Sequence, residues 1–404
     1  MSVGVEKGSV FGTGDADGVA TPFSRQDAVV SRMTPEELRA DVPALDETAY
    51  MNFGASGPSP RRVVDAAESC LEHHEFEAPV AEGMYPAAFD LYDDVRERVA
   101  GLLGADADEI ALTQSTTDGI NRIAGALEWA EGDVVVRTDL EHPAGILPWE
   151  RLQRRRGVEV RVVETDRGRI DVEEFRETVE GAKLACFSAL SWNYGTRLPV
   201  GELVDAAHEA GALTLVDAVQ VPGQAPLDVA EWDADAVAAA GHKWLLGTWG
   251  AGFLYVDADA ASELEPGAVG YRSVEEPDSD DWQFQDGAAR FEVGTTSPAP
   301  YAALGEAIDV CEELGVEAIE NRIGRLAGRL ADGVPADRLL SPAEPESGLV
   351  TIDVDDPEET VERLKDAGIV IRDLPFPEAV RASVHAVNTE EDVDLLLDAL
   401  DEEW

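Results

Sequence analysis

Lys243 is the residue whose type and surroundings most clearly indicate chemistry. It lies in the stretch AAGHKWLLGTWGAG at residues 239–252, and the 404-residue chain has only four lysines. Because its neighbours are glycine and apolar residues, we expect the amine to lie in an apolar pocket. Desolvation lowers the pKa of a lysine and makes its amine a nucleophile that can form a Schiff base. The sequence therefore indicates an imine-forming lysine at this position.

Asp217 and Gln220 follow an apolar run in the stretch TLVDAVQ, residues 214–220. An aspartate at the end of a strand is by itself typical of a turn or a helix cap. Beside an imine-forming lysine it has a chemical role, because a carboxylate can keep a pyridinium nitrogen protonated. Pyridoxal phosphate needs that proton in order to act as an electron sink.

Two further stretches could complete a cofactor site. QSTTDGIN brings Thr116 and Thr117 to the start of an expected helix, whose free N–H groups and positive dipole end favour an anion such as a phosphate. The same residues could equally serve as a helix N-cap. DLEHPAGILPWE carries His142, which could stack on a flat ring or have a structural role.

Seven short β-rich runs alternate with helical segments between about residues 60 and 270. The runs are DEIALTQS (108–115), GDVVVRTD (132–139), VEVRVVET (158–165), KLACFSAL (183–190), GALTLVDAV (211–219), ADAVAAAG (234–241) and GAGFLYVD (250–257). This alternation predicts an α/β fold with a mostly parallel sheet covered by helices. Polar residues recur at the carboxyl ends of these runs, where open α/β sheets bind ligands.

The flanking segments predict further units. Residues 1–32 lack periodicity and predict a disordered tail, which makes Met33 a candidate start of the protein. We expect residues 33–59 to pack on a small domain, residues 60–298 to form the large domain, and residues 299–404 to form a smaller α+β domain. That last domain begins with one long helical pattern.

The charge balance excludes some partners. The chain has 83 Asp and Glu residues against 31 Lys and Arg residues, a formal net charge of −52. Such a surface repels the nucleic-acid backbone, so no nucleic acid is expected as a partner. It resembles the surface of cytoplasmic proteins from halophiles, where concentrated salt screens self-repulsion. No run of about 18 uncharged apolar residues predicts a membrane span.

The three cysteines, Cys70, Cys186 and Cys311, lie far apart in the sequence and show no CxxC spacing. They match neither a disulfide framework nor a metal site. We therefore expect free thiols in a reducing cytoplasm and no bound metal.

Five motifs occur in a characteristic order. They are EHPAGILPW (141–149), LVDAVQ (215–220), GHKWLLGTWGAGFLYV (241–256), RFEVGTTSP (290–298) and VRASVHAVNTEEDVD (380–394). Together they resemble the class V aminotransferase family of fold type I pyridoxal-phosphate enzymes, most closely its cysteine desulfurase and selenocysteine lyase branch. The resemblance runs from about Tyr50 to residue 398. It implies a large domain with a mostly parallel, seven-stranded sheet between helices, a smaller α+β C-terminal domain and a homodimer.

The resemblance also implies roles around the cofactor ring. Lys243 would form the internal aldimine with pyridoxal 5'-phosphate, and Asp217 would pair with the pyridine nitrogen. Gln220 would contact the ring hydroxyl, and His142 would stack on the ring face.

Other matched positions would hold the phosphate and the substrate. Thr116, Thr117 and His242 would bind the phosphate. Thr295, in EVGTT, would reach the phosphate of the neighbouring subunit. Arg381, in VRAS, would hold the substrate α-carboxylate, a task suited to a planar bidentate donor.

Two departures from the family pattern lie close to these motifs. Ala240 stands where the family usually has a serine that donates to the phosphate, so Ser115, Thr296 or water is expected to compensate. Trp192 occupies the usual place of an asparagine near the substrate, with Asn193 beside it. Trp192 could line and narrow the pocket or pack in the core, and Asn193 is a candidate contact.

A third departure concerns the reaction. Cysteine desulfurases carry a persulfide-forming cysteine in the loop before the substrate-binding arginine. Here only residues 373–380 separate Arg372 from Arg381, and none of them is a cysteine. The other cysteines lie at positions that do not match the family nucleophile, so no thiolate is expected near the substrate sulfur.

Several functions therefore stay open. The first is transamination or β-elimination (C–S lyase activity) on an L-amino acid, through an external aldimine and a quinonoid. The alternatives are a cysteine desulfurase or selenocysteine lyase with an external thiol acceptor, an amino-acid epimerase, and a non-catalytic regulatory homologue. All the catalytic alternatives require the same cofactor motifs, so these motifs do not indicate which reaction the protein catalyses.

Overall fold

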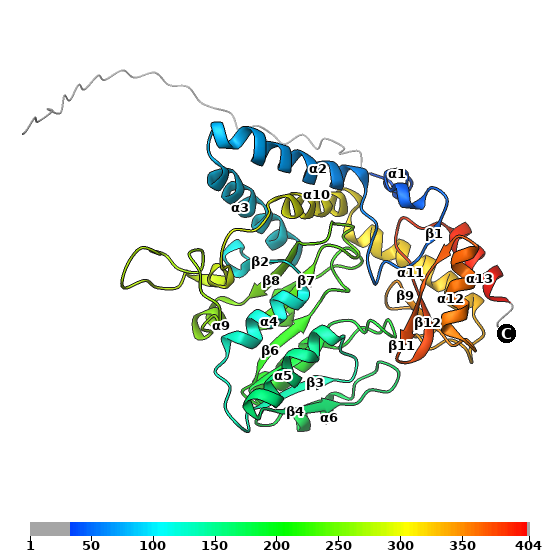
Figure 1. Ribbon diagram of the computed structural model, residues 1–404. Helices are drawn as coiled ribbons and strands as arrows, with labels where there is room; N and C mark the ends of the chain where they lie inside the picture. The colour runs from blue at the N-terminus through cyan, green and yellow to red at the C-terminus, as the bar shows by residue number, and fades with distance from the viewer. Residues whose placement is uncertain (1–32, 402–404) are drawn as a thin grey trace, which may run out of the picture. The chain divides into compact units, whose positions relative to one another are not determined.

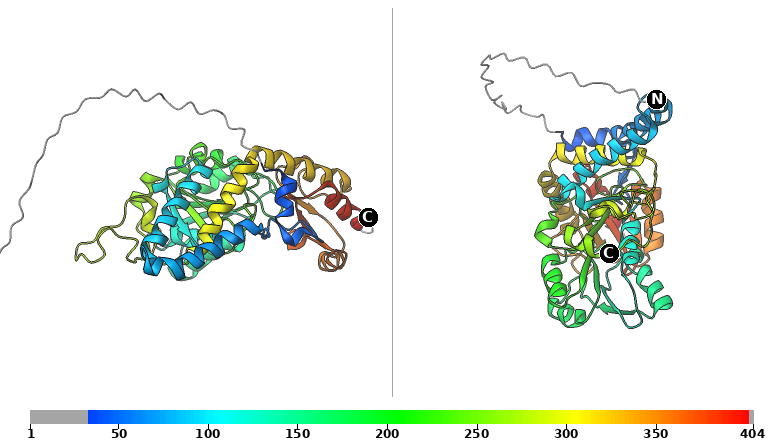
Figure 2. Two further views of the ribbon diagram at one scale, coloured as in Figure 1. Left: turned by 90° about the horizontal axis from the view of Figure 1, so that it is seen from above. Right: turned by 90° about the vertical axis from the view of Figure 1, so that its left-hand side faces the viewer.

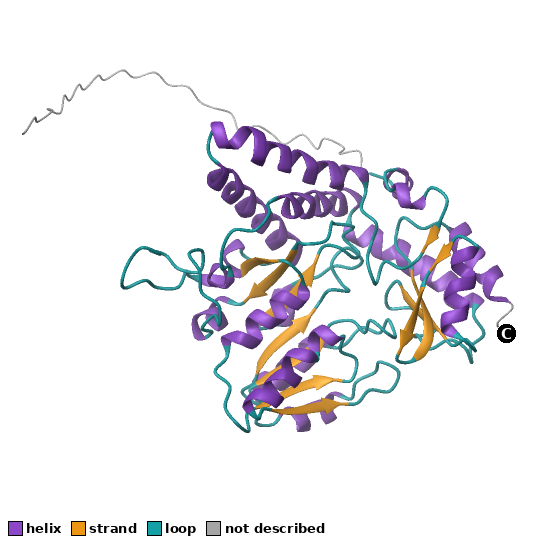
Figure 3. Cartoon of the chain, viewed as in Figure 1, coloured by secondary structure: helices purple, strands orange, loops and turns teal. Residues whose placement is uncertain are grey.

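A computed structural model describes residues 33–401 of the chain. The expected tail at residues 1–32 lies outside the described residues. The centre of the described part is a seven-stranded sheet with the order β2-β8-β7-β6-β5-β3-β4 (Figures 1 and 3). Its strands are β2 (Ile110–Thr113), β3 (Val134–Thr138), β4 (Glu159–Val163), β5 (Leu184–Ser188), β6 (Leu213–Asp217), β7 (Ala236–Ala240) and β8 (Gly252–Val256).

The sheet is mostly parallel, as the alternation of strands and helices predicts. Only β8 runs antiparallel to its two neighbours, β2 and β7. Each of the seven β-rich runs contains one of these strands. The carboxyl ends of six strands consequently meet at one edge of the sheet.

Alternate residues of the strands enter two separate hydrophobic clusters. In β5, for example, Ala185 and Phe187 join one cluster, whereas Leu184 and Cys186 join the other. The first cluster includes residues of α3, α6, α7 and α10, and the second includes residues of α4, α5 and α9. Helices cover both faces of the sheet (Figure 2). The strands β2, β5, β7 and β8 are accordingly buried along their whole length, whereas the edge strand β4 is partly exposed.

The helices connect the strands or pack beside the sheet. They are α1 (Pro35–Ala40), α2 (Arg61–Glu72), α3 (Met84–Leu103), α4 (Thr116–Ala126), α5 (Leu147–Arg156), α6 (Val172–Val179), α7 (Val200–Glu209), α8 (Val229–Trp232), α9 (Ala258–Glu263), α10 (Ala299–Leu314), α11 (Val316–Gly333), α12 (Pro357–Asp366) and α13 (Glu390–Leu400). Thr34 caps α1 in a capping box with Glu37.

The long helical pattern at residues 301–334 forms two helices, not one. Gly315 separates α10 from α11 with φ of +82°, a backbone conformation that residues with a Cβ rarely adopt. Gly315 therefore lets the chain turn between the two helices. The pattern of apolar side chains alone suggests one continuous helix.

A second, three-stranded sheet has the order β11-β12-β9, with β9 (Leu349–Ile352), β11 (Arg372–Pro375) and β12 (Glu378–Ser383). Its apolar residues form a third cluster with side chains of α11 and α13. The N-terminal segment is linked to this part of the chain: β1 (Ala49–Tyr50) pairs with β10 (Ile369–Val370). We propose the division into segments at residues 33–59, 60–298 and 299–404 on the basis of these two sheets.

Membrane spans and metal clusters are both absent from residues 33–401. No helix there is long and apolar enough to cross a membrane. No group of three or more His, Cys, Asp or Glu side chains in this part of the chain is arranged to hold a metal ion.

Candidate functional site

A cavity of about 190 Å³ opens at the carboxyl edge of the large sheet. Segments that follow β2, β3, β5, β6 and β7 line it, together with the N-terminal segment and the β11–β12 hairpin. The lining residues are Gly54, Ala55, Ser115, Thr116, Thr117, His142, Ala144, Ser188, Leu190, Trp192, Asp217, Val219, Gln220, His242, Lys243, Arg372 and Arg381. The fold thus brings together residues that are up to 327 positions apart, from 54 to 381.

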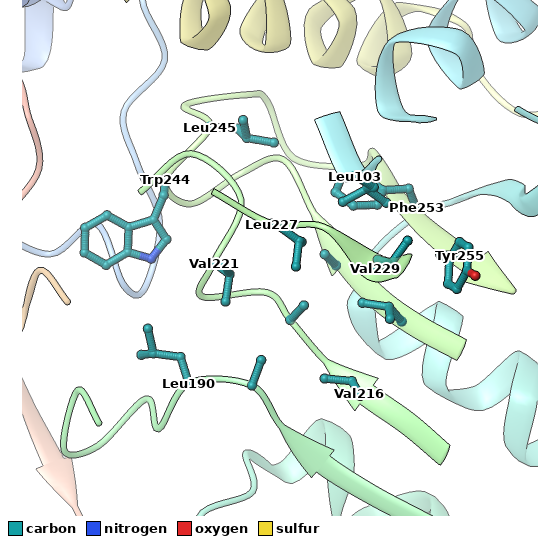
Figure 4. Packing of buried hydrophobic residues seen from close by; sticks show 14 of the residues in the cluster. Leu103, Leu190, Val216, Val221, Leu227, Val229, Trp244, Leu245, Phe253 and Tyr255 are labelled. Carbon is teal, nitrogen blue, oxygen red and sulfur yellow. The ribbon is translucent and has the colours of Figure 1, made fainter. Parts of the chain in front are cut away.

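The turn that carries Lys243 is held from several sides. The N–H of Leu246 donates to the Lys243 carbonyl at 3.1 Å, and Leu246 itself has φ of 62°, unusual for a branched side chain. Trp244 packs into the same buried cluster as Leu190 and Val221 (Figure 4). The Trp244 indole N–H donates to Gln220 Oε1 at 2.8 Å. These contacts fix the backbone from which the lysine extends into the cavity.

His385 supports the same turn. Its Nε2 donates to the Trp244 carbonyl at 3.0 Å, and its Nδ1 accepts from the Val387 N–H at 3.3 Å. Burial lowers the pKa of His385 to about 4, so the ring is neutral at neutral pH. The ring also stacks on Phe53, with centroids 4.8 Å apart. This histidine does not line the cavity, and its position near the lysine turn was not predicted.

Lys243 and Asp217 are the central pair of titratable groups. Enclosure in the cavity lowers the pKa of Lys243 to about 8, although the charge of Asp217 opposes this effect. Burial raises the pKa of Asp217, whereas an N–H from Val219 at 3.0 Å and the charge of Lys243 lower it. Roughly a tenth of the lysine amine is therefore neutral at pH 7 and available as a nucleophile, far more than for an exposed lysine.

Glu141 is a buried carboxylate that sequence reasoning did not single out. It is 3% exposed, and its oxygens accept from the Thr138 hydroxyl at 2.6 Å and from the Ser188 hydroxyl at 2.8 Å. Burial raises the pKa of Glu141 to about 7, and the nearby Asp217 also raises it. In the sequence, the feature that could have indicated a role for Glu141 is its position next to His142, shortly after a β-rich run.

Polar groups gather at the N-terminal end of α4. Ser115, Thr116, Thr117 and His242 all line the cavity there. The hydroxyl of Thr116 is buried and has no hydrogen-bond partner within the described residues. Ala240 is buried and does not line the cavity. Of the residues expected to compensate for it, Ser115 lines the cavity and Thr296 does not.

Arg381 and Trp192 occupy the other end of the cavity. Arg381 is fully buried, and its Nη1 donates to the Trp192 carbonyl at 2.6 Å. Its Nε and Nη2 have no partner within the described residues, nor does the indole N–H of Trp192. Trp192 lines the cavity, in agreement with one of its two expected roles, and packs edge-on against His142 with centroids 5.6 Å apart.

The stretch between Arg372 and Arg381, where the resemblance would place a nucleophilic cysteine, is a tight hairpin. Arg372 in β11 pairs directly with Arg381 in β12, and Pro375 pairs with Glu378. Only Phe376 and Pro377 form the turn between these strands, with a cis peptide bond between them. None of residues 373–380 lines the cavity.

Three other predicted site residues are Gln220, Asn193 and Thr295. Gln220 lines the cavity, but its amide already donates to the Gly54 carbonyl at 2.9 Å and accepts from Trp244. Asn193 is buried away from the cavity lining and binds Ser191 and the Phe376 carbonyl. Thr295 is exposed and does not line the cavity, so it contributes nothing to the site of its own subunit.

The residues present fit pyridoxal phosphate. A largely enclosed lysine with a lowered pKa faces the same cavity as a buried aspartate. An unpartnered hydroxyl and a helix N-terminus, both in the described part of the chain, are available for the phosphate, as is appropriate for an anion. The buried guanidinium of Arg381 remains for a carboxylate.

The chain is similar to known proteins over nearly its whole length. A family model described as aminotransferase class-V matches residues 49–396. A probable cysteine desulfurase of Methanothermobacter thermautotrophicus is 34% identical over 395 residues, which cover 92% of this chain and 98% of that protein.

Two solved structures share the fold. The apo cysteine desulfurase of Thermococcus onnurineus has a TM-score of 0.84 at 28% identity, and the match covers 92% of this chain and 98% of the other. The cystine C–S lyase C-DES, in complex with its product cysteine persulfide, has a TM-score of 0.83 at 27% identity, with 89% and 99% covered.

Proposed function

The chain belongs to the class V aminotransferase family and is a pyridoxal-phosphate-dependent enzyme, and on this premise we propose that it is a C–S lyase. The substrate is a sulfur-containing L-amino acid, and β-elimination breaks its Cβ–S bond. The sulfur leaves as sulfide or a persulfide, and the remaining fragment hydrolyses to pyruvate and ammonia.

The residues that line the cavity have separate tasks in this proposal. Lys243 would hold the cofactor through its amine and would take the proton from the substrate Cα. Asp217 would keep the ring nitrogen protonated, and His142 would hold the ring. Arg381 orients the substrate through its α-carboxylate. When bound, pyridoxal phosphate supplies the electron sink that makes the Cα proton acidic.

At the phosphate end, we assign Thr116, Thr117 and His242 to the phosphate. Gln220 retains one amide hydrogen for the ring hydroxyl. Asn193 acts only indirectly in this proposal, because its side chain is bound to Ser191 and to the Phe376 carbonyl.

The position of the cysteines is the observation that favours β-elimination over a reaction through an enzyme-bound persulfide. Cys186 and Cys311 are buried in β5 and α10, and Cys70 lies on α2. In the described part of the chain, none of them lines the cavity. Burial raises the pKa of each of these thiols, which lowers their thiolate fraction. Sulfur therefore has to leave the site without an enzyme-bound persulfide.

The test is an assay of the cofactor-loaded protein with L-cystine and L-cysteine, in which pyruvate and released sulfur are measured together. We expect equal amounts of the two products, with no requirement for added thiol. The Cys70→Ala variant, in which the least buried thiol is removed, should keep this activity within about twofold. Conversion of the cofactor to its aminated form without sulfur release would contradict the proposal and favour transamination.

We also propose a homodimer in which Thr295 of each subunit reaches the phosphate of the other. The exposure of Thr295 supports this arrangement. Light scattering gives the oligomeric state, and Thr295→Ala should weaken cofactor binding if the contact exists.

A cytoplasmic location, in a salt-rich cell, is a further proposal supported by the free thiols and the net charge of −52. Cell fractionation tests it.

A further inference from the structure

Glu141, Ser188 and Asp217 are buried neighbours at the carboxyl edge of the large sheet. The Ser188 hydroxyl oxygen lies 2.8 Å from one carboxylate oxygen of Glu141, which follows β3. On its other side, Ser188 is paired in register with Asp217, and β5 lies between β3 and β6. Neighbouring strands are only about 4.8 Å apart. One hydroxyl group therefore lies between two buried carboxyl groups.

Ser188 and Asp217 present their side chains on the same face of the sheet. Cys186 and Leu215, two residues earlier on β5 and β6, both enter the second hydrophobic cluster. Because the side chains of a strand alternate between the two faces, Ser188 and Asp217 share the face of that cluster. Both also line the cavity. The Ser188 hydroxyl can consequently turn toward either carboxyl group.

This hydroxyl can serve only one carboxylate at a time, because it has a single hydrogen to donate. Two buried anions on either side of it would also repel each other, and such a pair retains a proton on one member. Burial and then the charge of Asp217 raise the pKa of Glu141 to about 7, although hydrogen bonds from Thr138 and Ser188 oppose this shift. The charge of Lys243 favours the ionised form of Asp217. The shared proton therefore belongs on Glu141.

The other titratable or charged groups around the pair do not take this proton. They come from the elements packed against it and are Arg137, His142, Cys186 and Lys243. Burial lowers the pKa of His142 to about 4, so its ring stays neutral. Burial and the charges of both carboxyl groups raise the pKa of Cys186, so its thiol keeps its own proton. The two cations act on Cys186 and on Asp217, respectively, rather than on Glu141.

A protonated Glu141 reverses its hydrogen bond with Ser188. The oxygen–oxygen distance of 2.8 Å is typical of an O–H···O bond and suits a proton on either side. When Glu141 donates, the hydrogen of the Ser188 hydroxyl is free to point at Asp217. Asp217 already accepts the Val219 N–H at 3.0 Å, so a second donor would restrict its carboxylate to one orientation.

We propose that Glu141 is a positioning residue: as a neutral acid it donates to Ser188, whose hydroxyl in turn donates to Asp217 and holds that carboxylate ionised and oriented for the cofactor ring. When Glu141 loses its proton, Ser188 donates to Glu141 instead and Asp217 loses this donor. The inference rests on the part of the proposed function that assigns Asp217 to the ring nitrogen, and it does not depend on the reaction catalysed.

The first test measures the shared proton in the apo protein. The pKa of Glu141 follows from the pH dependence of the unfolding free energy, compared with that of Glu141→Gln. In an Asp217→Asn background the like charge is gone, so this pKa should fall by about one unit. Thr138→Val is the matched control with the opposite sign, because it removes a donor to the ionised form and should raise the pKa. A pKa of Glu141 that is unchanged by Asp217→Asn would overturn the inference.

The second test measures how much the Ser188 hydroxyl contributes to the cofactor dissociation constant. At about pH 6, where Glu141 is largely protonated, Ser188→Ala should weaken cofactor binding about tenfold, the effect of one hydrogen bond to a charged group. At about pH 8.5 the same substitution should cost less than about twofold, because Ser188 then donates to Glu141. In a Glu141→Gln background the loss should stay near tenfold at both pH values, since the glutamine amide is a permanent neutral donor.

Comparing each Ser188→Ala variant with its own parent cancels the titration of Lys243, which both proteins share. A loss of affinity that is the same at both pH values in the presence of Glu141 would indicate a direct or purely structural role of Ser188 and would overturn the inference. Neither test involves sulfur release. The expected pattern in a protein that releases no sulfur would overturn only the proposed C–S lyase, and sulfur release without the pattern would overturn only this inference.

Discussion

The hydroxyl of Ser188 donates to the buried carboxylate of Glu141 at 2.8 Å, and the Ser188 N–H donates to the same group at 3.1 Å. Ser188 is the last residue of β5 and pairs in register with Asp217 on β6. Glu141 precedes His142, which follows β3. The carboxylate thus joins the ends of two adjacent strands, β3 and β5, and β5 lies next to the strand that ends at Asp217.

Glu141→Gln should change how stability depends on pH. Because the pKa of Glu141 is raised from 4.5 to about 7 in the folded chain, the folded state holds this proton longer than the unfolded state. The wild-type protein therefore loses stability as pH rises from about 4.5 to 7, by about 3 kcal/mol. The glutamine variant has no such loss. Its unfolding free energy relative to wild type, from denaturant titrations at several pH values, should rise across this window. A difference that stays constant with pH would contradict the raised pKa.

Much of this architecture could be predicted because it depends on local patterns. Short β-rich runs mark the seven strands, and the carboxyl ends of parallel strands necessarily share an edge. The sequence alone therefore predicts that Asp217 and Lys243 lie together. Five ordered motifs likewise identify the fold type and the cofactor.

The remaining features depend on contacts between distant residues. Glu141 is one of 83 acidic residues, and only its contact with Ser188, which lies 47 positions further along the chain, distinguishes it from a surface carboxylate. The pairing of Arg372 with Arg381 depends on the register of a hairpin, and no motif in the sequence indicates the turn that sets this register. The helix ends at Gly315 because of the positive φ of this residue, and the helical patterns on both sides give no indication of that angle.

Cofactor capture by the apo protein should follow the titration of Lys243. Only the neutral amine attacks the aldehyde, and a pKa of about 8 leaves roughly a tenth of it neutral at pH 7. The rate of covalent capture, followed by absorbance, should therefore rise with pH around a midpoint near 8. A midpoint above 10, as for an exposed lysine, would contradict the enclosure of the amine. In Lys243→Ala, no borohydride-stable attachment should form at any pH.

Thr116→Val should weaken cofactor binding without weakening the fold. The Thr116 hydroxyl is buried and unpartnered within the described residues, so its removal costs the apo protein no hydrogen bond. A bound phosphate would lose a charge-assisted hydrogen bond, which corresponds to roughly a tenfold or greater loss of affinity. The cofactor dissociation constant and the apo melting temperature check both parts. Thr196→Val is the matched control, because its hydroxyl is also buried and unpartnered there but does not line the cavity. Equal affinities in the two variants would remove Thr116 from the phosphate site.

Gly57→Ala should disturb the lysine turn directly. A Cβ on Gly57 would lie 2.2 Å from the Lys243 carbonyl oxygen, and the N–H of Gly57 donates to the neighbouring His242 carbonyl at 2.8 Å. Neither backbone can move without displacing the other, so we expect a loss of about 1–3 kcal/mol in unfolding free energy. Cofactor affinity should fall as well, because the turn carries the amine. Gly101→Ala is the control: it lies inside α3 with no atom within 4 Å of the added Cβ, so it should stabilise the protein by about 0.5–1 kcal/mol. If Gly57→Ala behaved like Gly101→Ala, the close contact between the N-terminal segment and the lysine turn would be disproved.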